Sequence, residues 1–162
     1  MTIELKVLND KIVEVSNDNT LLDMLMEFEK TLDELQNNLT LMNNMIIHRG
    51  PDDDGVFKVS NANCSLAMGM RRLSIIDLNS GKQPIYSDDK KIVIVFNGEI
   101  YNYQNLRKEL QAQGVYFNTH SDTEVILRLY EKEGTTSFKK LDGMYAFSIY
   151  DYNKQKVFIA RD

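Results

Sequence analysis

The chain has 162 residues, of which 43% are hydrophobic and 27% are charged, as expected for one globular domain with a single core. Its net charge of -5 and its lack of a basic run exclude a surface built to bind nucleic acid. A single cysteine, Cys64, excludes an internal disulfide and a cysteine-based zinc site. Because the sequence shows no signal peptide and no long apolar stretch, we expect a cytoplasmic protein that does not enter a membrane. We also expect that it uses no metal and no cofactor.

Two short segments near the N-terminus predict a β-hairpin. Polar and apolar residues alternate over Ile3–Leu8 and again over Lys11–Val15. The dipeptide Asn9-Asp10 lies between them and suits a turn.

The next segment is the most periodic in the chain and predicts one long helix that Gly50-Pro51 ends. Its apolar residues recur at alternating spacings of four and three, which places them all on one stripe of a helix. They are Leu21, Leu25, Phe28, Leu32, Leu35, Leu39, Met42 and Ile46. The stripe has two interpretations: it packs on the core of the domain, or it forms a coiled-coil seam for self-association.

Four strand segments are predicted in the middle of the chain. Val56–Val59 and Cys64–Met70 have the pattern of paired strands, and Leu73–Ile76 continues it. Ile92–Phe96 is a continuous apolar and β-branched run, which is typical of a buried strand. Asn97-Gly98 is expected to end that strand.

Two helices and two further strands are predicted in the last third. Asn102 is a candidate cap for the first helix, and Ser121–Glu124 matches a capping box ahead of a second helix that Gly134 ends. Tyr145–Tyr150 and Val157–Ala160 have the pattern of strands. Because strands and helices occur in blocks rather than in strict alternation, the sequence predicts an α+β fold of sheets with helices layered on them.

Polar residues beside the apolar strands form a candidate site for an amino acid. A guanidinium of the pair Arg71-Arg72 can hold a carboxylate through two parallel hydrogen bonds. The carboxylates of Asp122 and Glu99 can neutralise an α-ammonium group. The side-chain amide of Asn97 and the backbone N–H of Gly98 can form an oxyanion hole. Each residue alone also has a structural interpretation: a solvated strand end, an acid in the first turn of a helix, or an ordinary turn.

These residues lie within a series of motifs in a fixed order. The motifs are MIIHRGPD (Met45–Asp52), RLSIID (Arg72–Asp77), QP (Gln83-Pro84), FNGEIYN (Phe96–Asn102), SDTEV (Ser121–Val125), LDGMYAF (Leu141–Phe147) and ARD (Ala160–Asp162). Over about residues 39–162 the chain resembles the class II glutamine amidotransferase domain of bacterial asparagine synthetases. The resemblance implies an α+β fold of two stacked, mainly antiparallel sheets with flanking helices, the N-terminal-nucleophile hydrolase architecture. It divides the chain into a divergent segment, 1–38, and an incomplete amidotransferase domain, 39–162.

The resemblance also implies a role for each candidate residue. By matching motifs, Arg72 holds the α-carboxylate of glutamine, Asp122 holds its α-ammonium group with help from Glu99, and Asn97 and Gly98 form the oxyanion hole. In the family, glutamine is hydrolysed to glutamate and ammonia. The ammonia then reaches a second domain, which makes asparagine from an ATP-activated aspartate. Glutamine is therefore the expected ligand.

The chain departs from the family's pattern at its start. The family begins Met-Cys-Gly and uses the exposed cysteine as the nucleophile and its own α-amine as the base, whereas this chain begins Met1-Thr2-Ile3. Cys64 lies mid-chain in an apolar segment and is expected to be a core residue. Thr2, exposed by removal of the methionine, is the alternative nucleophile.

The family also continues beyond Asp162, so the domain is expected to be truncated at its C-terminal end and to lack the ATP-binding loop of the synthetase. Two hypotheses follow. The chain is a glutamine-hydrolysing domain crippled by loss of its cysteine, or it is a non-catalytic module that binds glutamine or pairs through its N-terminal helix. In the second case the partner is a further copy of the chain or a synthetase chain. An open sheet edge is expected to be covered either by the hairpin Ile3–Val15 or by such a partner.

Overall fold

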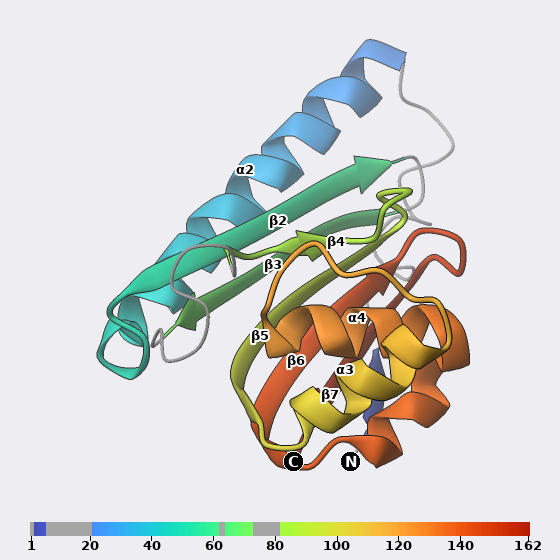
Figure 1. Ribbon diagram of the computed structural model, residues 1–162. Coiled ribbons are helices and arrows are strands. Elements are labelled where there is room, and N and C mark those ends of the chain that lie inside the picture. The colour runs from blue at the N-terminus through green and yellow to red at the C-terminus, as the bar shows by residue number, and fades with distance from the viewer. Residues whose placement is uncertain (1, 6–20, 62–63, 73–81) are drawn as a thin grey trace.

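The computed structural model describes residues 2–5, 21–61, 64–72 and 82–162 (Figure 1). These residues form four layers. Helix α2 (Leu21–Met45) lies on a two-stranded sheet, this sheet lies on a five-stranded sheet, and helices α3 (Tyr103–Ala112) and α4 (Asp122–Glu133) cover the far face of the larger sheet. The short 3-10 helices η2 (Ile47–Arg49) and η3 (Gly134–Lys140) follow α2 and α4.

Both sheets are antiparallel throughout the described residues. In the small sheet, β2 (Asp53–Asn61) pairs with β3 (Cys64–Arg72). The large sheet has the order β1-β7-β6-β5-β4, with strands β1 (Thr2–Leu5), β4 (Ile85–Tyr86), β5 (Ile92–Ile100), β6 (Gly143–Asp151) and β7 (Lys156–Arg161). The predicted α+β fold with two stacked, mainly antiparallel sheets and flanking helices is therefore confirmed.

Strand β5 is central because each of its faces contributes to a different core. Val93 and Val95 pack with Phe57 and Met68 of the small sheet. The alternate residues of β5 pack with α3, α4, β6 and β7 on the opposite face, in a cluster that includes Ile94, Phe96, Ile100, Leu106, Leu110, Val125, Ile126, Leu129, Phe147 and Ile149. Such burial on both faces explains the continuous apolar run from which the strand was predicted.

The prediction that Asn97-Gly98 ends this strand is wrong, since β5 continues through both residues to Ile100. Gly98 has a φ of 135° and lies opposite Tyr145 of β6. A Cβ at this position would overlap the carbonyl oxygen of Met144 and would lie 2.6 Å from the Cα of Tyr145. Glycine therefore serves here to let two backbones approach inside a strand, rather than to make a turn.

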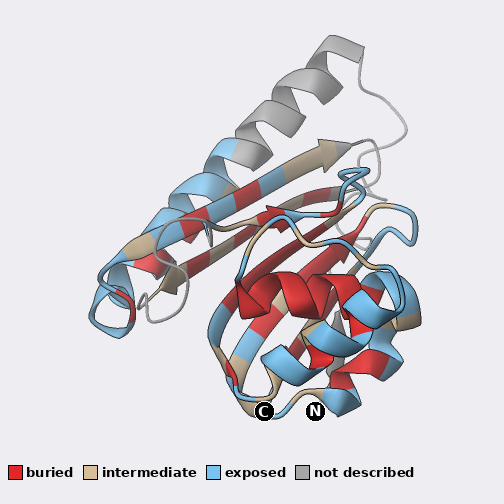
Figure 2. Ribbon diagram, in the orientation of Figure 1, coloured by how far each residue is buried: buried red, intermediate tan, exposed pale blue. Residues whose placement is uncertain are grey.

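Helix α2 lies on β3 through residues that match the predicted stripe only in part. Leu39 and Asn43 are buried over Gly69, whereas Met42 is 63% exposed and Ile46 is 41% exposed. Much of the coloured part of α2 is shown as exposed in Figure 2. A helix with 3.6 residues per turn drifts away from a strict 3.5-residue repeat, so the stripe leaves the contact face near its end. Packing on the core is confirmed at Leu39, and the alternative of a self-associating seam stays a prediction.

The caps of α3 and α4 use other partners than those predicted. The side chain of Asn102 does not cap α3 but donates to the carbonyl of Lys140 and accepts from the backbone N–H of Asp142. Ser121 caps α4 by accepting from the N–H of Thr123. Glu124, however, bonds to the loop that precedes α4, as described below, and so takes no part in a capping box. Gly134 ends α4 as predicted.

The first strand of the predicted N-terminal hairpin is observed in part. Residues Thr2–Leu5 form β1 and pair with β7 at the edge of the large sheet. The second predicted strand, Lys11–Val15, and the predicted strand Leu73–Ile76 lie outside the described residues. Among the described helices, none combines the length and apolar character that a bilayer-spanning segment needs.

Candidate functional site

Arg72 is the last residue of β3, where the turn after α2 holds its backbone. The carbonyl of Arg72 accepts from the N–H of Asp52 at 3.1 Å, and Arg72 also forms a parallel bridge with Pro51. Gly50 is packed so closely that a Cβ there would lie 2.5 Å from the backbone nitrogen of Arg72. The motif His48–Asp52 therefore fixes the position of the Arg72 backbone at the end of β3.

The side chain of Asn97 links the two sheets. Its amide nitrogen donates to the backbone carbonyl of Arg71, the neighbour of Arg72. Successive backbone carbonyls of a strand point to opposite sides of it. The carbonyl of Arg72 points toward Asp52, so the carbonyl of Arg71 points away from β2, to the unpaired edge of β3. A carboxamide nitrogen has two N–H groups, so one orients Asn97 and the second stays available for a ligand oxygen.

Asp122 lies at the start of α4 and bonds to the end of β5. Its Oδ2 accepts from the backbone N–H of Ile100 at 3.1 Å, and its Oδ1 accepts from the N–H of Thr123 at 2.9 Å. Asp122 is only 5% exposed. This burial raises the pKa of the Asp122 carboxyl above its ordinary value, although the two N–H donors oppose the rise.

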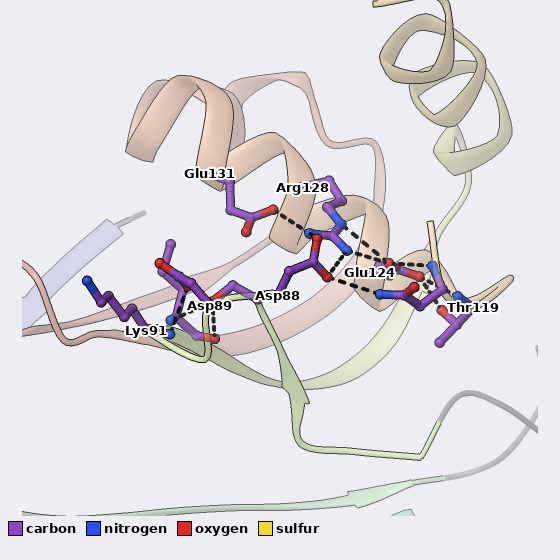
Figure 3. Close-up of polar contacts among 10 residues, drawn as sticks. Asp88, Asp89, Lys91, Thr119, Glu124, Arg128 and Glu131 are labelled. Atoms are coloured by element: carbon purple, nitrogen blue, oxygen red, sulfur yellow. Dashed lines mark hydrogen bonds and ion pairs between the residues drawn. The ribbon is translucent and has the colours of Figure 1, made fainter. Parts of the chain in front are cut away.

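A charged network fixes the loop that leads into Asp122 (Figure 3). One oxygen of Glu124 accepts from the N–H of Asn118 at 2.9 Å, and the other accepts from the N–H of Thr119 at 2.6 Å. Arg128, one turn later, donates to Glu124 and also forms a bidentate pair with Asp88, at 2.8 and 3.0 Å. Glu124 and Arg128 are nearly fully buried, so the loop, α4 and the β4–β5 connection are held as one unit.

The structure brings five of the six predicted site residues to one region. Asn97, Gly98 and Glu99 follow one another on β5, and Asp122 is bonded to the next residue, Ile100. The backbone of Arg72, at the end of β3, lies beside them because the carbonyl of its neighbour Arg71 accepts from the Asn97 amide. The site therefore lies where β3, β5 and α4 meet.

Thr2, the sixth candidate, lies elsewhere in the sheet. It pairs with Ala160, which pairs with Phe147, which in turn pairs with Phe96 of β5. With three inter-strand steps of about 4.8 Å each, Thr2 is roughly 14 Å from the strand that carries Asn97 and Gly98. The structure does not bring it to the other five residues.

Sequence reasoning missed the contacts that hold the site together. Asn97 bonds to the Arg71 carbonyl across 26 positions, Gln83 to Phe96 across 13, and Arg128 to Asp88 across 40, and no spacing rule signals such contacts. The only available signal was the Glu at 124 and the Arg at 128, one helical turn apart on α4, which is a favourable ion-pair spacing. Within the described ranges, no group of three or more His, Cys, Asp or Glu residues is placed to hold a metal ion.

Comparison with known proteins adds a family match. Residues 24–162 match the family model described as a glutamine amidotransferase domain. "Asparagine synthetase [glutamine-hydrolyzing] 1" of Bacillus subtilis is 50% identical over 121 residues, which are 75% of this chain and 18% of that protein. "Asparagine synthetase B [glutamine-hydrolyzing]" of Escherichia coli is 42% identical over 129 residues, which are 80% of this chain and 22% of that protein.

A solved structure is also similar. "Structure of the allosteric regulatory enzyme of purine biosynthesis" matches with a TM-score of 0.49 and 29% sequence identity, over 59% of this chain and 23% of that chain. The chain spans between 18% and 22% of the length of the two curated relatives.

Proposed function

Because the chain belongs to the glutamine amidotransferase domain family, matched over residues 24–162, we propose that it binds glutamine where β3, β5 and α4 meet. The single observation that carries this proposal is the hydrogen bond from Ile100 to Asp122 at 3.1 Å. It sets a buried carboxylate directly beside Glu99 and Gly98, so that groups suited to an ammonium ion and to an amide carbonyl are neighbours. The names of its relatives specify glutamine hydrolysis, which agrees with such a ligand.

Each polar end of glutamine has a partner in this proposal. The Arg72 guanidinium holds the α-carboxylate, and Asp122 holds the α-ammonium group with Glu99 beside it. The free N–H of the Asn97 amide and the backbone N–H of Gly98 face the side-chain carbonyl of glutamine. The charge-assisted hydrogen bonds at the carboxylate and the ammonium group contribute about 1.5–3 kcal/mol each.

Hydrolysis needs a nucleophile about 3 Å from the amide carbon, and neither candidate in this chain has that position. Cys64 begins β3, and Arg72 ends it eight residues later, which separates them by roughly 26 Å at about 3.3 Å per residue. Thr2 lies three strands from Gly98. We therefore propose that this chain binds glutamine without hydrolysing it.

The experiment that tests this function has two parts. Calorimetry measures glutamine binding by the purified chain, and a coupled assay measures the release of glutamate. We expect binding with no glutamate release above background. Release that disappears in a Thr2→Ala variant would instead make Thr2 the nucleophile, and the absence of both binding and release would overturn the proposal.

A second candidate function is pairing through α2. Leu41, Met42 and Met45 are 63%, 63% and 77% exposed on this helix, an unusual concentration of apolar side chains at the surface. A second copy of the chain can cover them. Light scattering tests this idea: a dimer that becomes a monomer in Met42→Lys supports it, and a monomeric wild type at high concentration contradicts it. A synthetase chain as partner in place of a second copy is tested by adding one to the same experiment.

A further inference from the structure

The side chain of Gln83 makes a pair of hydrogen bonds to β5 where a neighbouring strand would otherwise pair. This pair lies at Phe96, immediately before the candidate site. Its Nε2 donates to the carbonyl of Phe96 at 2.9 Å, and its Oε1 accepts from the N–H of Phe96 at 2.6 Å. In the β4–β5 register, Ile85 pairs with Ile94, so Gln83 is opposite Phe96. The side-chain amide thus makes the pair of bonds that the backbone would make in a longer β4.

The same side chain reaches the start of α4. The Nε2 of Gln83 lies 3.4 Å from the Oγ1 of Thr123, the residue that follows Asp122. The small sheet also touches this residue, because a Cβ on Gly55 would lie 2.7 Å from the carbonyl oxygen of Gln83. One partly buried residue therefore contacts β2, β5 and α4 together.

These contacts end at the two halves of the site. Phe96 precedes Asn97 and Gly98, which face the amide end of the ligand, and Thr123 follows Asp122, which faces the ammonium group. The distance between the two halves must match the length of one amino acid, since each polar end of the ligand needs its own hydrogen-bond partners. A single amide bonded to both halves is suited to setting that distance.

We propose that Gln83 is a positioning residue that makes the site selective for glutamine over asparagine, which has the same polar groups and one methylene fewer. This inference rests on the proposed glutamine site. In the wild type, one methylene corresponds to a preference for glutamine of roughly 10- to 200-fold.

The test compares the two dissociation constants, by calorimetry, in the wild type and in two variants. Gln83→Met keeps the length of the side chain but removes both bonds to Phe96, and Gln83→Glu keeps only the acceptor for the Phe96 N–H. We expect the ratio of the asparagine constant to the glutamine constant to fall to within about threefold of unity in Gln83→Met. If that variant does not fold, the same fall is expected in Gln83→Glu.

The control is Leu110→Ala, which removes a core side chain that is 2% exposed on α3 and lowers stability without touching the site. In Leu110→Ala, the ratio of the asparagine constant to the glutamine constant should equal that of the wild type. This result would separate a positioning effect of Gln83 from a general loss of stability. A wild-type ratio preserved in a folded Gln83 variant would overturn this inference and leave the glutamine site standing. A wild type that binds neither amino acid would overturn both.

Discussion

The backbone N–H of Ile100 donates to the carboxylate of Asp122 at 3.1 Å, and this bond joins the end of β5 to the first turn of α4. The other carboxylate oxygen accepts from Thr123 at 2.9 Å. The hydroxyl of Ser121 also donates to Oδ1, at 3.4 Å. A carboxylate has about four lone-pair sites, so these three donors leave one for a bound ammonium group. The hydrogen bond that joins β5 to α4 therefore also orients the Asp122 carboxylate toward the site.

The raised pKa of Asp122 predicts a pH dependence of glutamine binding. Only the ionised carboxylate attracts an ammonium group, so affinity should fall as the pH drops through the pKa of Asp122. Because burial raises this pKa, the loss should begin at a higher pH than for an ordinary aspartate. Calorimetry between about pH 4 and pH 8 measures the profile.

The control for this profile is Asp122→Asn, which cannot ionise. It should bind weakly at every pH and lack the step that the wild type shows, so that any change with pH that remains belongs to other groups such as Glu99. A wild-type affinity that stays constant down to the ordinary pKa of aspartate, about 3.9, would show that Asp122 does not bind the ammonium group.

Arg72→Ala should remove most of the affinity for glutamine. Loss of a bidentate, charge-assisted contact corresponds to about 2–4 kcal/mol of binding free energy. Lys108→Ala, which removes an exposed positive charge from α3, is the matched control and should bind like the wild type. An unchanged dissociation constant in Arg72→Ala would remove this residue from the site.

Gly98→Ala should destabilise the domain, because the new Cβ meets backbone atoms of β6 and the φ of 135° suits glycine alone. We expect a loss of about 3 kcal/mol or more in the free energy of unfolding. Gly114→Ala separates the two causes: Gly114 has a φ of 85° but no atom within 4 Å of the added Cβ. It should lose only about 1 kcal/mol in the same urea titration. Equal losses in the two variants would contradict a role for the close approach of the strands.

Arg128→Met should be strongly destabilising, since it leaves the buried carboxylate of Glu124 without its cation. Removing one partner of a buried ion pair costs about 3–5 kcal/mol. Asp88→Asn, at a side chain that is 71% exposed, should cost under about 1 kcal/mol. Urea unfolding of both variants tests the contrast. A loss in Arg128→Met no larger than that in Asp88→Asn would show that the network is not needed to hold α4.

The sequence predicted most of the elements because their signals are local. The apolar run Ile92–Phe96 and the stop at Gly134 each depend on residues within a few positions, and the structure confirms both. The site residues Arg72, Asn97, Gly98, Glu99 and Asp122 were chosen from their types and from a family resemblance. The structure places them together, whereas their roles toward glutamine stay predictions.

The errors came where a distant contact outweighed a local preference. Glu124 has the spacing of a capping box, but the preceding loop folds back and offers it two N–H donors, while Arg128 of the same helix donates to it as well. Asn97-Gly98 is a common turn pair, yet strand β6 continues beside it and keeps it in the sheet. Neither β6 pairing nor loop folding can be read from the residues next to these motifs.

The most direct test of a glutamine site at the junction of β3, β5 and α4 is an NMR titration of the isotope-labelled chain with L-glutamine. We predict saturable shifts of the backbone amides of Gly98, Glu99, Ile100 and Thr123, with no comparable change on the exposed face of α3. Shifts confined to other parts of the chain, or no shifts at millimolar glutamine, would contradict the proposed site.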